Sequence, residues 1–582
     1  MKILRVAITP RIVQAVSRRI EWLFSESGYF AKISALVPAA ADVVRFVAGL
    51  AAEIRYESMK VVRAVLSALL AYVVVSQAAT FDVKAFGAKG DGQTLDSAAI
   101  NKTIEAAAAA GGGTIEIGPG TYVTGSIRLR SNITLHLEHG AVLQASGDAS
   151  AYDAPEPNAW DRYQDFGHSH WRNSLIWGEN LNNVAITGGG MISGKALARE
   201  RGGGGDKAIA LKQCRNVTLR DFSISYGGHF GILATGVDNL TIDNLTIDTN
   251  RDGIDIDSCR NVRISNSSVN SPNDDAIVLK GTHALGAARP TENVTIVNCL
   301  VSGFDLGSLL DATYKPSATP PPDRDGSTGR IKIGTESEGD FRNIAITNVT
   351  FDHSRGLAFE SVDGSHIEDI EVSNITMREV SNAPFFFRLG SRMRAPEGVA
   401  IGSIRRIAIS NVIAFGSDAR YPSIITGIPG HDIEDVTFRN IRIVSKGGLS
   451  LDQVSKQPPD LVNTFFFRGA GGVPPREPFA TPEREKEYPE PSMFGLLPAW
   501  AFFIRHASGI EMDGIDVSAE HEDHRPAFVL EDVTRPEFRN LNARIAEGSA
   551  SFVLLKVRDF LLRGGRNLVD LKIDGLVDRK EF

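Results

Sequence analysis

The sequence predicts an all-β fold, a single-stranded parallel β-helix (a solenoid) with long loop insertions. A short phrase recurs along the chain: Asn or Asp, an aliphatic residue, and then strict alternation of apolar and polar residues. Its first starts, at Asn216, Asn239 and Asn261, are spaced by 23 and 22 residues, a period typical of solenoids. A lone strand of this length cannot bury its apolar face, whereas stacking the units in parallel buries it.

The phrase continues through the second half of the chain, where the spacing becomes longer because loops enter single coils. Its further starts are Asn293, Asn343, Asp369, Arg406 and Asp435. No long helical period interrupts these strands, which argues against a βαβ fold. A β-sandwich array is the structural alternative, but it does not explain the 22-residue period.

Residues 1–78 are predicted to lie outside the solenoid. Met59 and Lys60 precede an apolar run over residues 61–75. Residues 76–78 then offer small side chains at the positions that a signal peptidase reads, so the segment has the pattern of a secretory signal. The run is too short for a comfortable membrane span. We therefore interpret residues 1–58 as an extension upstream of the true start, 59–78 as a signal peptide and 79–582 as one secreted or periplasmic domain. The alternative is that residues 1–58 form a genuine helical or membrane-facing segment.

An Ala-rich stretch from Asp96 to Ala110 is the one predicted helix, and we expect it to cap the N-terminal end of the solenoid. Two insertions stand out, at residues 305–328 and 452–500, and the second holds nine of the 26 prolines. Proline is unsuited to strand interiors. Long loops on a rigid scaffold usually shape a binding site.

Composition excludes several classes of function. The net charge of −8 and the absence of a basic arm argue against nucleic acid as the partner, although a local basic pocket could still hold an anionic substrate. Three cysteines, Cys214, Cys259 and Cys299, are no disulfide framework and are interpreted as buried apolar thiols. The sequence contains no zinc pattern, phosphate-binding loop or Ser-His-Asp elbow, so we expect no metal and no other cofactor.

Three aspartates are the candidate catalytic residues. Asp252 closes one coil and Asp274 and Asp275 close the next, 22 residues later, so they should lie roughly 5 Å apart along the stack. Crowded carboxylates repel one another and raise the pKa of at least one of them. A protonated acid beside ionised carboxylates is what glycoside hydrolysis requires. The alternatives are turn-capping aspartates and a calcium site, but two clusters one coil apart favour catalysis.

The chain resembles glycoside hydrolase family 28, the polygalacturonases and their rhamnogalacturonan-cleaving relatives, from Phe81 to near the C-terminus. The motifs that carry this resemblance are Phe86-Gly87-Ala88-Lys89-Gly90-Asp91-Gly92, Gly120-Thr121-Tyr122, Asn250-Arg251-Asp252 (Arg in place of the family's Thr) and Asp274-Asp275. The resemblance implies a right-handed helix and an inverting hydrolase of an acidic pectic polysaccharide. It further implies Asp274 as general acid, with Asp252 and Asp275 holding and activating the water.

The sequence departs from the family at two motifs, a Gly-His-Gly and a later Arg-Ile-Lys. Either Arg330 and Lys332 are the Arg-Ile-Lys motif itself, or residues 334–336 take the place of Gly-His-Gly and Arg-Ile-Lys falls on residues 358–360. The strand register after residue 340 favours the second alignment. The histidine is absent in both, which fits exo-acting or rhamnogalacturonan-directed members better than an endo-acting enzyme. The long insertions also suit an exo-acting enzyme.

Polar and basic side chains near these motifs are predicted to bind the substrate, since arginine in particular suits uronate carboxylates. They are Asn250, Lys280, Arg330, Lys332, His229, His170 and Arg388, with Arg392 and Arg394 as further candidates. Two other functions stay open. A lyase or epimerase on the same solenoid would give an unsaturated, ultraviolet-absorbing product or need calcium, and a non-catalytic glycan-binding β-helix would release no reducing sugar.

Overall fold

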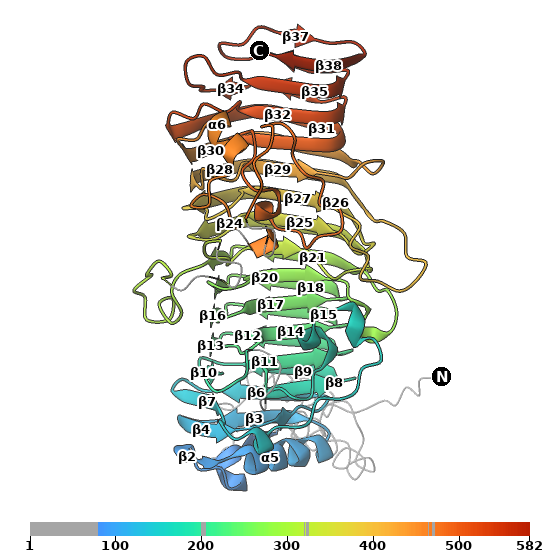
Figure 1. The fold of residues 1–582 in the computed structure, drawn as a ribbon. Helices are drawn as coiled ribbons and strands as arrows, with labels where there is room; N and C mark the ends of the chain where they lie inside the picture. The colour runs from blue at the N-terminus through green and yellow to red at the C-terminus, as the bar shows by residue number, and fades with distance from the viewer. Residues whose placement is uncertain (1–78, 200–204, 319–320, 322–324, 464, 468–471) are drawn as a thin grey trace, which may run out of the picture. The chain divides into compact units, whose positions relative to one another are not determined.

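The computed structural model describes residues 79–199, 205–318, 321, 325–463, 465–467 and 472–582. The predicted extension and signal peptide, residues 1–78, lie outside the described residues. Residues 80–582 form one compact unit. Figure 1 shows this unit as a stack of short strands that begins at helix α5 (Ser97–Ala109) and ends at β37 (Leu571–Lys572) and β38 (Leu576–Glu581).

The strands pair into three parallel stacks that run along the solenoid. The first contains β5 (Ile127–Arg128), β8 (Ile176–Glu179), β11 (Lys207–Lys212), β14 (Phe230–Thr235), β17 (Asp252–Asp257), β20 (Ile277–Lys280), β23 (Ile331–Ile333), β25 (Leu357–Ser361), β27 (Phe385–Leu389), β29 (Ser423–Thr426), the start of β31 (Phe502–His521), β32 (Phe528–Thr534) and β35 (Phe552–Arg558). The second contains β1 (Thr80–Asp82), β3 (Gly113–Ile117), β6 (Ile133–Leu137), β9 (Asn182–Thr187), β12 (Arg215–Arg220), β15 (Asp238–Asp243), β18 (Arg260–Ser265), β21 (Thr291–Val297), β24 (Phe341–Asp352), β26 (His366–Arg378), β28 (Ser403–Ser417), β30 (Ile433–Gly447), the middle of β31, β33 (Glu537–Arg539) and β36 (Leu561–Arg563).

The third stack contains β2 (Asp91–Leu95), β4 (Gly120–Thr124), β7 (Ala141–Ala145), β10 (Met191–Ser193), β13 (Ser223–Ser225), β16 (Thr246–Asp248), β19 (Ser268–Asn270), β22 (Leu300–Ser302), the ends of β24, β26, β28, β30 and β31, and β34 (Asn542–Ala543). The long strands β24, β26, β28 and β30 serve two stacks and β31 serves three, because residues with positive φ, such as Asn348 at 54°, bend them. The predicted parallel solenoid is therefore confirmed.

The residues that begin the repeated phrase explain why the coils turn where they do. Asn216, Asn239 and Asn261 have φ values of 56°, 58° and 57°, in the left-handed region that asparagine tolerates better than most residues. Each also donates its side-chain amide to the asparagine one coil earlier, as Asn239 Nδ2 does to Asn216 Oδ1 over 2.9 Å. The inward side chains that follow, such as Val217 and Leu240, stack in register and form the core.

The predicted helix and the predicted thiols are both confirmed. Helix α5 lies at the N-terminal end, buries Ile100 and Ile104, and packs against β3 and β5. Cys214, Cys259 and Cys299 are free and buried. Among the described residues, no helix has the length and apolar character needed to cross a membrane.

Candidate active site

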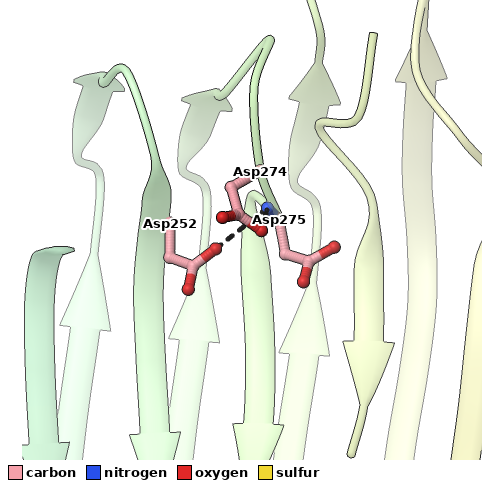
Figure 2. Close-up of side chains that lie close together, drawn as sticks. All are labelled: Asp252, Asp274 and Asp275. Atoms are coloured by element: carbon pink, nitrogen blue, oxygen red, sulfur yellow. Dashed lines mark hydrogen bonds between the residues drawn. The ribbon is translucent and has the colours of Figure 1, made fainter. Parts of the chain in front are cut away.

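The three predicted aspartates lie together on the outward face of the first stack (Figure 2). One oxygen atom from each of Asp252, Asp274 and Asp275 falls within 4.8 Å of the others. The backbone N–H of Asp275 donates to Asp252 Oδ1 over 3.0 Å, which ties the two coils together at the site. The side chain of Asp274 is 26% exposed. Asp252 and Asp275 lie deeper, at 6% and 1%.

The environments of these carboxyl groups differ in charge. Burial, reinforced by repulsion from Asp274, Asp255 and Asp275, raises the pKa of Asp252 well above its ordinary value. Burial also acts on Asp274, but the charges of Arg251 and Lys332 and a hydrogen bond from Asp252 outweigh it and lower the Asp274 pKa. Lys332 and Arg330 likewise overcome burial and lower the pKa of Asp275. Of the three carboxyl groups, Asp252 is therefore the one whose surroundings favour the protonated form.

Arg251 occupies the position where the family motif has Thr, and it pairs directly with Asp274. Its Nε donates to Asp274 Oδ2 over 3.1 Å, and its Nη1 lies 3.1 Å from Nδ1 of His229. His229 Nε2 is in turn 3.0 Å from Asp165 Oδ2. His229 thus borders the site through Arg251, as its predicted place one coil before Asp252 suggested, and its ring is buried.

Arg330 and Lys332 enter the site as partners of Asp275. Arg330 Nε donates to Asp275 Oδ1 over 2.7 Å, and Lys332 Nζ contacts the other carboxylate oxygen. Both side chains are almost fully buried. Because β23 pairs directly with β20, the two cations lie on the coil next to the aspartates and residues 358–360 lie one coil further, as the second alignment assumes. Both cations thus pair with protein carboxylates, and their contact with substrate stays a prediction.

The outward residues of the first stack change in character along the solenoid. At the catalytic coils this row contains Asp255, Val278 and Lys332. On the N-terminal side it becomes apolar, and Trp171 covers Ala210 and Leu233.

On the C-terminal side the row is apolar again: it contains Ala358, Phe386, Ile424, Phe503, Val529 and Val553. Met493, Phe494 and Leu497 of the second insertion cover it. The coils of β17, β20 and β23 therefore differ from their neighbours in charge and not in exposure, since Asp255 and Val278 are 0% exposed and Lys332 is 3% exposed.

A rim of charged side chains closes the site at the C-terminal ends of these strands. Lys280 Nζ lies 3.3 Å from Glu336 Oε2. Arg394 pairs with the other oxygen of Glu336 over 2.8 Å and donates to the backbone carbonyl oxygens of Arg162 and Gln164. Arg394 thus links the loop after β27 to the loop before β8 across the site. Lys280 and Arg394 fit their predicted place near the site.

Three other predicted substrate ligands lie differently from expectation. Arg388 is 1% exposed and donates to the carbonyl oxygens of Gly427 and Glu483, so it anchors the second insertion and its prediction as a substrate ligand is corrected. His170 is buried, with its Nδ1 2.7 Å from the Glu156 carbonyl oxygen, and is corrected to a structural residue. Asn250 precedes Arg251 at the site, and its Oδ1 accepts no hydrogen bond from the described residues.

Sequence reasoning missed Glu490, Tyr488 and Glu360. Glu490 reaches the site from the second insertion and receives both Nη atoms of Arg330, over 2.6 and 3.2 Å. Burial raises the pKa of Glu360 to about 7, against the opposing charges of Arg330 and Lys332. The only sequence signal for the insertion's position was the lack of alternation in strands such as Phe385–Leu389, where both faces are buried.

Comparison with known proteins agrees with this geometry. Residues 80–305 match the family model described as rhamnogalacturonase A/epimerase, pectate lyase-like. A probable polygalacturonase of Vitis vinifera is 30% identical over 315 residues, 50% of this chain and 60% of the relative. An exo-poly-alpha-D-galacturonosidase of Dickeya chrysanthemi is 29% identical over 172 residues, 28% of this chain and 27% of the relative. The chain thus spans 60% and 27% of the lengths of these two relatives.

Among solved structures, the family 28 exopolygalacturonase of Yersinia enterocolitica superposes with a TM-score of 0.56 at 17% identity, over 79% of this chain and 78% of that one. The protein is a right-handed parallel β-helix with a cluster of carboxylates on its outward sheet. Within that class, residues 80–305 are similar to the rhamnogalacturonase and pectate-lyase-like family model, and the chain is similar in sequence to polygalacturonases.

Proposed function

We propose that the protein hydrolyses an acidic pectic polysaccharide and acts from a chain end. The observation that carries this proposal is a three-aspartate cluster on charged coils that lie between two apolar stretches covered by the chain's own loops. Covered stretches on both sides of the cluster favour the end of a polymer over its middle. The names of the relatives, a polygalacturonase and an exo-galacturonosidase, agree with this substrate and this mode.

One proton, carried by Asp252, protonates the leaving group in the proposed mechanism. Asp252 passes its proton to Asp274, the most exposed of the three carboxylates, and Asp274 protonates the leaving glycosidic oxygen. Asp252, now ionised, and Asp275 hold the attacking water, and Asp252 takes its proton. After the bond is cleaved, the cluster again holds one proton, and no other acid is consumed. Lys332 and Arg330 keep Asp275 ionised throughout.

The first product of the reaction shows whether the configuration of the anomeric carbon is inverted or retained. The family resemblance implies inversion of the anomeric centre. Proton NMR of the first product gives its anomeric form directly. Product analysis on homogalacturonan and rhamnogalacturonan oligomers, side by side, tests the hydrolysis itself, and an ultraviolet-absorbing product would instead establish a lyase.

Replacing Arg394 by Ala is expected to change the products without abolishing turnover. The side chain joins the two walls of the site through Arg162, Gln164 and Glu336, so its loss opens the rim. We expect the share of oligomers among the first products on a long substrate to rise several-fold. Arg405→Ala, which removes an arginine paired with Glu368 on the second stack, is the matched control. Identical product distributions for Arg394→Ala and the wild type would disprove the closing role.

We also propose export. If translation starts at Met59 and residues 59–78 are removed, mass spectrometry of the native extracellular or periplasmic protein should show an N-terminus near Ala79. Peptides from residues 1–58 on the mature protein would establish the alternative, a retained extension.

A further inference from the structure

Arg251 lies between the proposed acid and a carboxylate of the loop before β8. Its Nε donates to Asp274 Oδ2 over 3.1 Å, and its Nη2 lies 3.9 Å from Asp165 Oδ2. His229 contacts both partners, with Nδ1 3.1 Å from Arg251 Nη1 and Nε2 3.0 Å from Asp165 Oδ2. The guanidinium is therefore held in place from the loop as well as by the acid itself.

The contact between Arg251 and Asp274 lies on the more exposed side of the aspartate cluster. The two side chains are 16% and 26% exposed, whereas Arg330 and Lys332, on the side of Asp275, are 3% and 4% exposed. The family motif that residues 250–252 resemble has Thr in place of Arg251, and a threonine hydroxyl carries no charge. Arg251 thus brings to the acid a positive charge that the motif does not supply.

Charges of both signs surround this contact. The charged or titratable groups that face Asp274 or Arg251 are Asp252, Asp255, Asp275, Lys280, Lys332, His229, Asp165 and His168. Burial opposes the ionised form of Asp274, but the charges of Arg251 and Lys332 outweigh it and lower the Asp274 pKa. Of these two cations, Arg251 donates a hydrogen bond to Asp274, whereas Lys332 contacts Asp275.

We propose that Arg251 is a positioning residue for the general acid, which it both orients and strengthens. Two contacts fix the plane of the Asp274 carboxyl group: Arg251 Nε at Oδ2 and the backbone N–H of Asp275 at Oδ1. A cation beside a carboxyl group favours its ionised form, so a protonated Asp274 gives its proton to the leaving oxygen more readily. This inference rests on the proposed hydrolysis and adds to it a residue that acts through Asp274.

The test compares Arg251→Gln, which removes the charge and keeps most of the length, with Arg251→Lys, which keeps the charge. Without the cation, Asp252 and Asp274 both bind a proton more tightly, so the pH range in which the cluster holds one proton moves upward. We expect the basic limb of the kcat/KM profile, measured on a pectic oligomer that the wild type cleaves, to rise by about 1–3 pH units in Arg251→Gln. In Arg251→Lys it should rise by less than half as much.

Arg220→Gln is the matched control, because Arg220 pairs with Asp221 on the second stack. Its profile should equal that of the wild type. Arg251→Thr, which restores the residue of the family motif, serves as a second charge-free variant if circular dichroism shows that Arg251→Gln does not fold. A purely structural role would lower the rate without moving the profile. An unmoved basic limb in the charge-free variant, or an equal shift in Arg251→Lys, would therefore overturn the inference. If the wild type releases no reducing sugar at any pH, it is the proposed function that fails.

Discussion

Replacing Asp274 by Asn is expected to lower kcat by roughly 10²–10⁴-fold, because the amide cannot deliver a proton to the leaving oxygen. Asn has almost the same shape, and Asp274 Oδ1 accepts the backbone N–H of Asp275 over 3.1 Å, a contact that the amide oxygen can keep. The loss should therefore fall on kcat, while the fold and the KM change little. Initial rates of reducing-sugar release, with circular dichroism as a check of the fold, measure this.

Asp221→Asn is a suitable control, since Asp221 lies on the ladder of turns with a φ of 73° and Asn adopts that conformation readily. It should retain wild-type activity. More than a tenth of the wild-type rate in Asp274→Asn would exclude the acid role and would direct attention to Asp252 as the group that meets the leaving oxygen.

Replacing Asp252 by Asn is expected to have two opposite effects, a loss of activity of similar size and a gain in stability that grows with pH. The folded protein raises the pKa of Asp252 well above its value of about 3.9 in the unfolded chain. The contribution of this group to stability is thus fully present below about pH 4 and is lost as pH rises through the folded pKa. Above that pKa, the wild type carries a buried, repelled carboxylate and the variant does not.

Urea denaturation of both proteins at a series of pH values measures the second effect. The stability difference in favour of Asp252→Asn should be smallest near pH 4 and should increase with pH. Asp275→Asn should behave differently, because Lys332 and Arg330 lower the pKa of Asp275 and removing its charge takes a carboxylate partner from both cations. A stability difference for Asp252→Asn that does not change with pH would contradict the proton placement.

The architecture could be predicted because the coils repeat one sequence pattern, a turn residue followed by alternating apolar and polar residues. Asn239 and Asn261 mark left-handed turns one coil apart, and the aliphatic residues after them can be buried only by stacking. Residues one period apart lie side by side on adjacent coils of a solenoid. The 22-residue spacing of Asp252 and Asp274 therefore predicted that they lie close together. Helix α5 followed from its Ala-rich composition and from Ile100 and Ile104 on one face.

The pairing of charges could not be predicted in the same way. Glu490 meets Arg330 across 160 positions of sequence, through an insertion that has no period of its own. Arg388 was misjudged for the same reason: its partners are backbone carbonyl groups, including that of Glu483, which any sequence could supply. A cation near a motif is a substrate ligand only if the protein leaves it unpaired, and this depends on loops whose path the repeat does not specify.

The apolar row beneath the second insertion has a consequence for the redesign of the molecule. Phe386, Ile424 and Phe503 are tolerable on an outer face only while Met493 and Phe494 shield them from water. A variant without the insertion would expose this apolar row. An engineer who shortens residues 452–500 to obtain a through-going groove would therefore have to substitute the row in the same step, or the shortened protein would aggregate through it.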